Sequence, residues 1–269
     1  MAKQLVIALL SMLLWTPAQA RKWQPVEFVD LELILAVDVS RSMNARRLQL
    51  QREGYVAAFR DPEVIRAIKS GPQGRVAVTY VEWSGSDSQT TIVPWRVIGS
   101  ADDANAFAND LEQSPTSRTR RTSISAMLNK AQNIFESSGV RALRRVVDVS
   151  GDGPNNSGPP VVKARNDLIR TGVVINGLPI LSEPDEGPGY MVKVDLDDYY
   201  RDCVIGGPGS FYIPVSSMQN FAKAIRMKLI REIAAAPKSA MPGVPRQVDY
   251  QPAAASPLGR RVTCSIAQD

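Results

Sequence analysis

The chain of 269 residues contains no histidine. Histidine is the usual base of Ser-His-Asp and Cys-His catalysis and a common zinc ligand, so these sites are excluded in their usual forms. Catalysis by this chain would have to use carboxylates, lysine or a hard metal ion. The missing imidazole therefore directs the search for function toward side chains that carry oxygen.

Long apolar runs are missing beyond the N-terminus. Residues 5–15 have almost no polar side chain, follow Lys3 and lead to Ala18-Gln19-Ala20. A basic start, a short apolar core and Ala-x-Ala predict a signal peptide over residues 1–20. No cysteine lies near the cleavage site, and no later segment is long and apolar enough to span a membrane. We therefore expect a protein without a stable membrane anchor, secreted across the inner membrane into the periplasm or the extracellular space.

Cysteine is scarce, and Cys203 and Cys264 are the only two. We expect them to form a disulfide, because export places them in an oxidising compartment and the pair is even in number. The alternative is two unrelated thiols. Losing Lys3 with the leader lowers the net charge only from +5 to +4, which does not indicate binding to nucleic acid.

Nucleotide-binding loops are absent, since neither G-x-G-x-x-G nor G-x-x-x-x-G-K-[ST] occurs where a strand leads into a helix. Strand patterns alternate with helix patterns, which predicts an α/β fold with a doubly wound, mostly parallel sheet and helices on both faces. A Ser/Gly/Asp cluster between two β-rich runs predicts a hairpin with one antiparallel edge strand. The predicted strands are 31–37, 75–83, 90–97, 145–149, 173–178 and 211–215, and the predicted helices are 44–59, 61–68, 101–111, 122–135, 161–170, 195–200 and 216–233. Residues 236–269 are rich in Pro, Ala and Ser and predict an extended tail.

Oxygen-bearing side chains follow the most apolar strand. Asp38, Ser40 and Ser42 come directly after it, Thr122 stands at the start of a predicted helix, and Asp152 follows a later strand. Because the carboxyl edge of a parallel sheet is where open α/β folds bind ligands, we expect these five side chains to converge. Carboxylates and hydroxyls are hard oxygen ligands that suit Mg²⁺.

The order Asp-x-Ser-x-Ser, Thr, Asp resembles the metal-ion-dependent adhesion site of von Willebrand factor A domains, over residues 28–235. The phrase at 148–156 also resembles an uncharacterised group of exported bacterial proteins in that superfamily. The resemblance implies that hydroxyls bind a divalent ion, Mg²⁺ or alternatively Mn²⁺ or Ca²⁺, and that the carboxylates act through waters or from close behind. It further implies a non-enzymatic module whose ion accepts an acidic side chain of a partner protein. In some relatives the closing helix couples ion coordination to affinity.

The same residues have structural interpretations. Ser42 and Thr122 can cap helices, and Asp152-Gly153 can form a plain turn. Two other functions stay open, a metal-assisted phosphohydrolase and a structural domain whose ion only orders loops. The hydrolase is disfavoured because such enzymes usually carry a second Asp where this chain has Ser40, and serine is no acid or base at neutral pH.

Charged residues near the motif also have two interpretations. Arg41, Arg118, Arg120 and Arg121 form either a basic rim that steers an acidic ligand or a set of solvated loop charges. Asp148, inside an apolar strand, is either a further site residue or, more commonly, a buried and hydrogen-bonded carboxylate.

Overall fold

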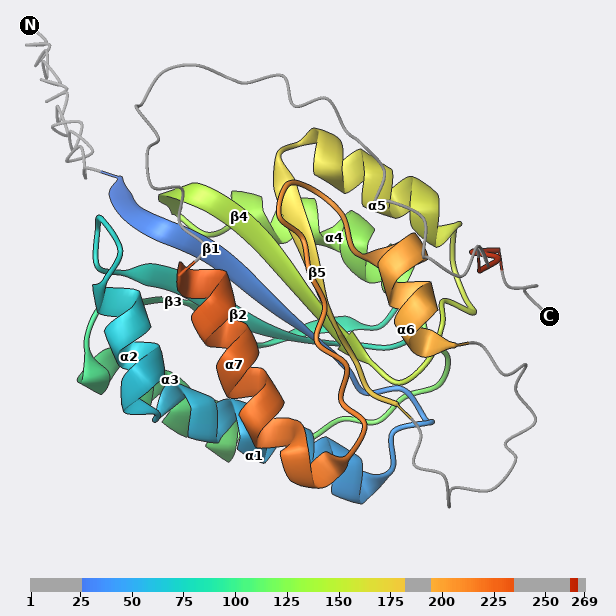
Figure 1. The fold of residues 1–269 in the computed structure, drawn as a ribbon, viewed down its shortest axis with the longest axis horizontal. Helices are drawn as coiled ribbons and strands as arrows, with labels where there is room; N and C mark the ends of the chain where they lie inside the picture. The colour runs from blue at the N-terminus through green and yellow to red at the C-terminus, as the bar shows by residue number, and fades with distance from the viewer. Residues whose placement is uncertain (1–25, 182–194, 235–261, 266–269) are drawn as a thin grey trace, which may run out of the picture.

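A five-stranded sheet forms the centre of the protein, with the strand order β3-β2-β1-β4-β5 (Figure 1). The computed structural model describes residues 26–181, 195–234 and 262–265, so the predicted signal peptide and most of the tail lie outside the described residues. Strand β3 is antiparallel to β2, and the other neighbours are parallel. The strands are β1 (Glu27–Asp38), β2 (Val76–Trp83), β3 (Gln89–Ile98), β4 (Val140–Gly151) and β5 (Val173–Pro179). This confirms the predicted α/β fold with one antiparallel edge strand.

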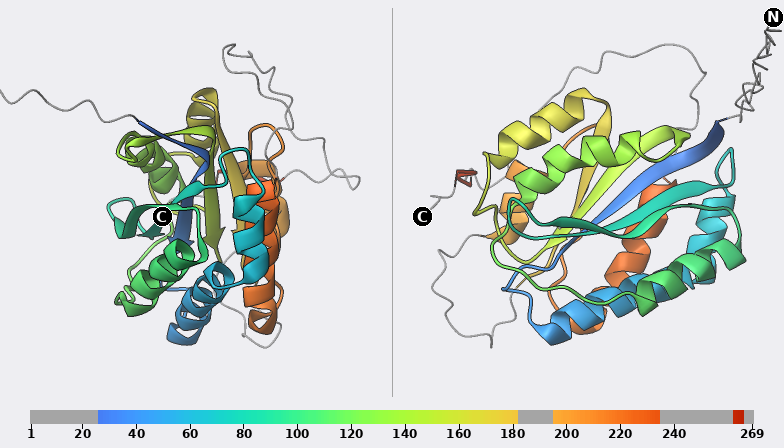
Figure 2. Two further views of the ribbon diagram at one scale, coloured as in Figure 1. Left: turned by 90° about the vertical axis from the view of Figure 1, so that its left-hand side faces the viewer. Right: turned by 180° about the vertical axis from the view of Figure 1, so that it is seen from behind.

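Helices cover both faces of the sheet (Figure 2). One face packs against α1 (Ala45–Phe59), α2 (Pro62–Lys69), α3 (Ala101–Gln113) and α7 (Phe221–Ala234). The other packs against α4 (Ile124–Glu136), α5 (Val161–Arg170) and the short α6 (Leu196–Tyr199), which continues into a π-helical turn at Tyr200–Val204.

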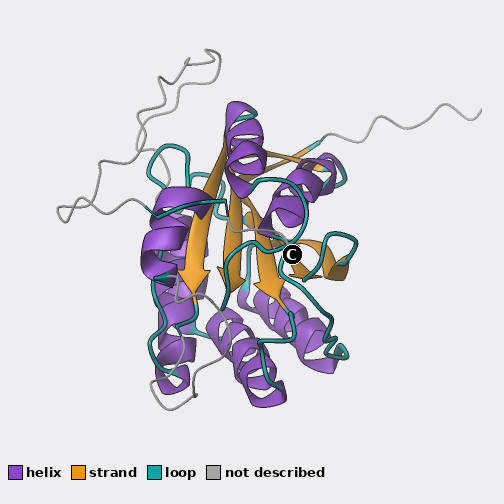
Figure 3. Cartoon of the chain, turned by 90° about the vertical axis from the view of Figure 1, so that its right-hand side faces the viewer, coloured by secondary structure: helices purple, strands orange, loops and turns teal. Residues whose placement is uncertain are grey.

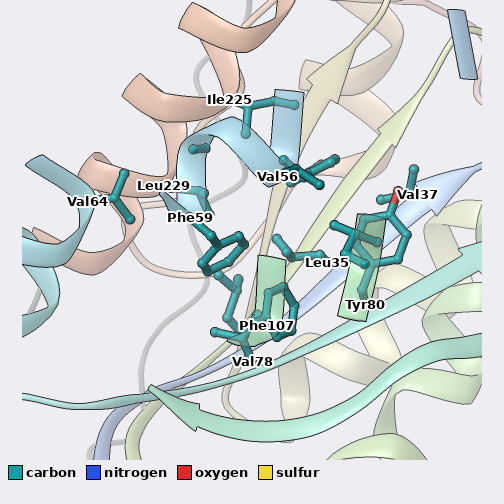
Figure 4. Packing of buried hydrophobic residues seen from close by; sticks show 14 of the residues in the cluster. Leu35, Val37, Val56, Phe59, Val64, Val78, Tyr80, Phe107, Ile225 and Leu229 are labelled. Atoms are coloured by element: carbon teal, nitrogen blue, oxygen red, sulfur yellow. The ribbon is translucent and has the colours of Figure 1, made fainter. Parts of the chain in front are cut away.

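Alternate residues of β1 enter two separate cores. Leu33 and Leu35 pack on the α1 side, where Phe59 of α1 and Phe107 of α3 lie 4.5 Å apart between ring centroids (Figure 4). Ile34 packs on the α4 side. Burying one such side chain contributes about 1.5–3 kcal/mol. The central strand is therefore held firmly from both faces, and the residues at its end have a fixed position.

The main differences from the sequence predictions lie at element ends. Strand β4 begins at Val140 rather than 145, because an arginine-rich, partly exposed stretch pairs with β1. The predicted strand at 211–215 is wrong as a continuous strand: it forms only isolated bridges to β5 and its extension, because Pro179 of β5 has no N–H to donate to the Ile213 carbonyl. The closing helix α7 begins at Phe221 rather than 216, after a 3₁₀ turn.

The structure contains the disulfide between Cys203 and Cys264, with 5.5 Å between the Cα atoms. This bond ties the short tail segment 262–265 to the π-helical turn, across 61 positions of sequence. Within the described ranges, no helix combines the length and the apolar character needed to cross a membrane.

Candidate metal centre

Strand β1 places Asp38 at the carboxyl edge of the sheet, where loops follow the arrowheads of the parallel strands in Figure 3. The side chain is fully buried, and its Oδ1 accepts a hydrogen bond of 2.7 Å from the Ser40 N–H. The Asp38 carbonyl accepts a further bond of 3.2 Å from Gln51 Nε2 of α1. The carboxylate is thus held in one orientation at the point where the sheet ends.

A chain of hydroxyl contacts joins this loop to the end of β4. The Ser40 and Ser42 Oγ atoms lie 2.9 Å apart, and Ser42 Oγ donates to Asp152 Oδ1 over 2.6 Å. The last two residues are 110 positions apart in sequence. The structure therefore brings together four of the five residues singled out in the sequence.

Thr122 lies in the segment that leads into α4 and is buried. Asn156 holds it from both sides, since its Oδ1 accepts from the Thr122 N–H and its N–H donates to the Thr122 carbonyl, each over 2.8 Å. The Thr122 Oγ1 lies 3.8 Å from where a Cβ on Gly153 would stand. Gly153 follows Asp152, so this third segment reaches the same edge of the sheet.

Neither Ser42 nor Thr122 caps a helix. The cap of α1 is Asn44, whose side chain accepts from the Arg47 N–H, and the cap of α4 is Ser123, whose hydroxyl accepts from the Ala126 N–H. The structural interpretation of the two hydroxyls as helix caps is therefore wrong. Both are left to face the sheet edge.

The second carboxylate oxygen of Asp38, Oδ2, is buried and has no hydrogen-bond partner among the described residues. Burial and the charge of Asp152 raise the pKa of Asp38 to about 8. A Cβ on Gly151 would lie only 2.9 Å from this oxygen, so glycine keeps the space beside it open. A buried carboxylate oxygen without a hydrogen-bond partner is costly, and a cation beside it would reduce that cost.

The donor set is dominated by neutral oxygen. Two carboxylates and three hydroxyls lie at this edge, whereas the described part of the chain holds no cluster of three or more His, Cys, Asp or Glu that could bind a metal. Such donors fit a hard divalent ion such as Mg²⁺ better than a soft one.

Two contacts at the site were missed by the sequence analysis. Arg47 of α1 is buried, and its Nη1 lies 3.5 Å from Asp152 Oδ2. The sequence contains one weak signal for this contact. A basic residue in the first turn of a helix is unfavourable next to the positive end of the helix dipole, which suggests a carboxylate partner. Asn156 lies within the segment 148–156, and no pattern in the sequence indicates its two hydrogen bonds to Thr122.

Asp148 does not belong to this site. It is buried in β4 and forms an ion pair with Lys228 of α7, which also pairs with Glu232. Asn176 of β5 donates to Glu232 over 3.1 Å. Burial and the charge of Asp148 raise the pKa of Glu232 to about 7. This group fastens α7 to the sheet, in agreement with the structural interpretation of Asp148.

Solved structures with a similar fold include a protein of the mussel byssus and two pilus proteins. Proximal thread matrix protein 1 from the mussel byssus, with a zinc-occupied MIDAS motif, is 21% identical, with a TM-score of 0.54 over 77% of this chain and 46% of its own. The pilus adhesin SpaC from Lactobacillus rhamnosus GG is 15% identical, with a TM-score of 0.54 over 78% and 30%. The vWF domain of the type V pili tip protein Mfa5 from Porphyromonas gingivalis is 9% identical, with a TM-score of 0.52 over 79% and 98%.

This chain spans about half the length of the mussel protein and less of the adhesin, and identities this low show the fold alone. No curated protein sequence matches the chain. A sequence profile described as protein of unknown function, DUF1194, matches residues 28–237. The chain therefore belongs to the DUF1194 family, and its fold is that of a von Willebrand factor A domain.

Proposed function

We propose that this protein is an exported, non-enzymatic module that binds a partner protein through a divalent ion. Asp38, Ser40, Ser42, Thr122 and Asp152 would hold the ion. The observation that carries the proposal is the buried Asp38 oxygen without a hydrogen-bond partner, beside hydroxyls that cap no helix. Loops that were only held together by hydrogen bonds would not require a buried carboxylate oxygen without a partner.

The donor types explain why a bound ion would attract a further acid. Hydroxyls contribute little negative charge, so two carboxylates only balance a divalent cation and leave it electrophilic. Mg²⁺ also tends to keep exchangeable waters, one of which an acidic side chain of a partner can replace. Carboxylate and hydroxyl donors suit Mg²⁺ or Mn²⁺, with Ca²⁺ as an alternative, and the MIDAS motif of the mussel protein holds another divalent ion, zinc.

The proposed location is the periplasm or the extracellular space. It is supported by the leader predicted over residues 1–20 and by the disulfide, which suits an oxidising compartment. The pilus proteins that share the fold agree with this location and with an adhesive role.

Calorimetric titration of the full chain with Mn²⁺ tests the proposal. We expect Thr122→Val to weaken Mn²⁺ binding at least about tenfold, because it removes a ligand hydroxyl and nearly keeps the side-chain volume. The matched control is Thr91→Val, since Thr91 is exposed on the outer strand β3. Equal Mn²⁺ affinity in the Thr122 variant and the wild type would refute the assignment.

The partner-binding half of the proposal needs its own measurement. A short peptide with one central Asp should bind the Mn²⁺-loaded chain, and a chelator or Asp38→Ala should abolish that binding. Binding that persists unchanged in chelator would contradict a role for the ion. An ion that stabilises the fold without any effect on peptide binding would favour the purely structural alternative.

A further inference from the structure

Five exposed arginines lie in or next to the segments that carry the candidate ligands. They come from the loop after β1, the first turn of α1 and the segment before α4. We refer to them as the arginine rim, which consists of Arg41, Arg46, Arg118, Arg120 and Arg121. Arg41 stands between two of the candidate ligands in sequence, and Arg121 directly precedes a third. Most of the rim arginines therefore belong to the same loops as Ser40, Ser42 and Thr122.

The two loops that carry most of the rim are joined into one surface. The Thr119 N–H donates to the Val39 carbonyl over 3.1 Å, and Ser40 and Thr119 form a β-bridge. The Arg118 Nη2 donates to the Arg41 carbonyl over 2.7 Å. These contacts hold the arginines of the second loop beside the hydroxyls of the first.

In the part of the chain that the structure describes, no rim arginine forms an ion pair with a carboxylate. Exposed arginines elsewhere do so, as Arg60 with Glu112 and Arg75 with Glu27. Like charges gathered without counter-charges repel one another, and their field attracts anions to the surface between them.

We infer that the partner presents an acidic peptide segment, in which the acid bound by the ion is flanked by further Asp or Glu residues that contact the arginine rim. This inference rests on the proposed function, which supplies the ion and the first acid. A single carboxylate on the ion would leave the rim uncompensated. Guanidinium groups match carboxylates in paired hydrogen bonds, so flanking acids are the complementary chemistry.

Two synthetic peptides of equal length test the inference, one with a single central Asp among Ser and Ala, the other with Glu on both sides of that Asp. Their affinities for the Mn²⁺-loaded full chain are measured by fluorescence anisotropy at low and high salt. The rim variant combines Arg41→Gln, Arg118→Gln and Arg120→Gln. The control variant makes the same charge change at three exposed arginines outside the rim, near the amino ends of the strands, namely Arg66, Arg141 and Arg170.

We expect the flanked peptide to bind the wild type and the control variant at least about tenfold more tightly than the single-acid peptide at low salt, because several exposed charge pairs add small gains. This advantage should nearly disappear in the rim variant and at high salt. The Mn²⁺ affinity of the rim variant should stay within about threefold of the wild-type value. The rim arginines are exposed and bind no ligand atom, so solvent and salt screen their effect on the ion.

An advantage for the flanked peptide that is equal in the rim and control variants would overturn the inference. The inference would also be overturned if a sulfated polysaccharide displaced the flanked peptide and a second, unlabelled acidic peptide did not. Peptide binding that needs the rim but survives chelation would instead overturn the proposed function, so the two failures are distinguishable.

Discussion

Replacing Asp38 by Asn separates two effects of this carboxylate: its effect on the free energy of unfolding and its contribution to ion binding. The side chain is fully buried, and one of its oxygens accepts the Ser40 N–H. An amide oxygen can keep that hydrogen bond, while the charge is lost. In the absence of divalent ions the substitution should therefore stabilise the protein, although it removes a central residue of the candidate metal centre.

The size of the effect follows from the pKa of the carboxyl. Burial and Asp152 raise it from its ordinary value of 3.8 to about 8. Because one pKa unit corresponds to about 1.4 kcal/mol, the full rise corresponds to a loss of stability of at most about 6 kcal/mol. Relaxation around a buried charge lowers such costs, so we expect a loss of several kcal/mol.

The direction of the pH dependence is fixed by the raised pKa. Below pH 4 the carboxyl is protonated in both the folded and the unfolded chain, and it costs the fold no charge burial. Between about pH 4 and 8 the unfolded chain releases the proton while the folded chain keeps it, so stability falls as the pH rises. Above pH 8 both states are ionised and the loss stays constant.

Urea unfolding in the presence of a chelator, followed from pH 4 to 9, measures this effect. The difference in unfolding free energy between wild type and Asp38→Asn should widen steadily up to about pH 8 and then level off. Glu232 titrates in both proteins, so its contribution cancels in the difference. Saturating Mn²⁺ should stabilise only the wild type, by about 2.7 kcal/mol at a hundred times the dissociation constant. Parallel pH curves for the two proteins would refute the reasoning.

Two other substitutions test the surroundings of the site and the tail. Gly151→Ala should weaken Mn²⁺ binding strongly, because its Cβ would stand 2.9 Å from Asp38 Oδ2, and calorimetry that finds unchanged affinity would contradict the position of the ion. Cys264→Ser should lower the unfolding free energy by about 2–4 kcal/mol in urea titrations, since the lost disulfide closes a long loop. A reducing agent should lower the unfolding free energy of the wild type by the same amount and leave that of the variant unchanged.

The sheet could be predicted because its strands are apolar and its connections are helical. The run 31–37 is buried on both faces, and its two cores follow from that composition. The first half of β4 could not be predicted, because its three arginines break the apolar pattern of a strand that forms through pairing with β1. The run 211–215 shows the reverse case: it is β-rich, yet it forms no continuous ladder, because its neighbour Pro179 on β5 lacks the N–H that would donate to Ile213.

The candidate ligands could be named from the sequence, but the sequence could not show whether their hydroxyls are used as helix caps. Thr122 and Ser123 are both plausible caps of α4, and only the structure assigns the cap to Ser123. Arg121 has a φ of 69°, which is an uncommon backbone conformation for a residue other than glycine. No pattern in the sequence predicts it. The contact of Arg47 with Asp152 joins residues so distant in sequence that only the assembled sheet brings them together.

The buried ion pairs of Lys228 limit how α7 can behave. This ammonium lies between Asp148 of β4 and Glu232 of its own helix, with almost no solvent contact. If the helix slid along its axis like a piston, Lys228 would leave Asp148, and an uncompensated charge in the interior costs several kcal/mol. The ion pairs of Lys228 therefore make sliding of α7 along the sheet energetically costly.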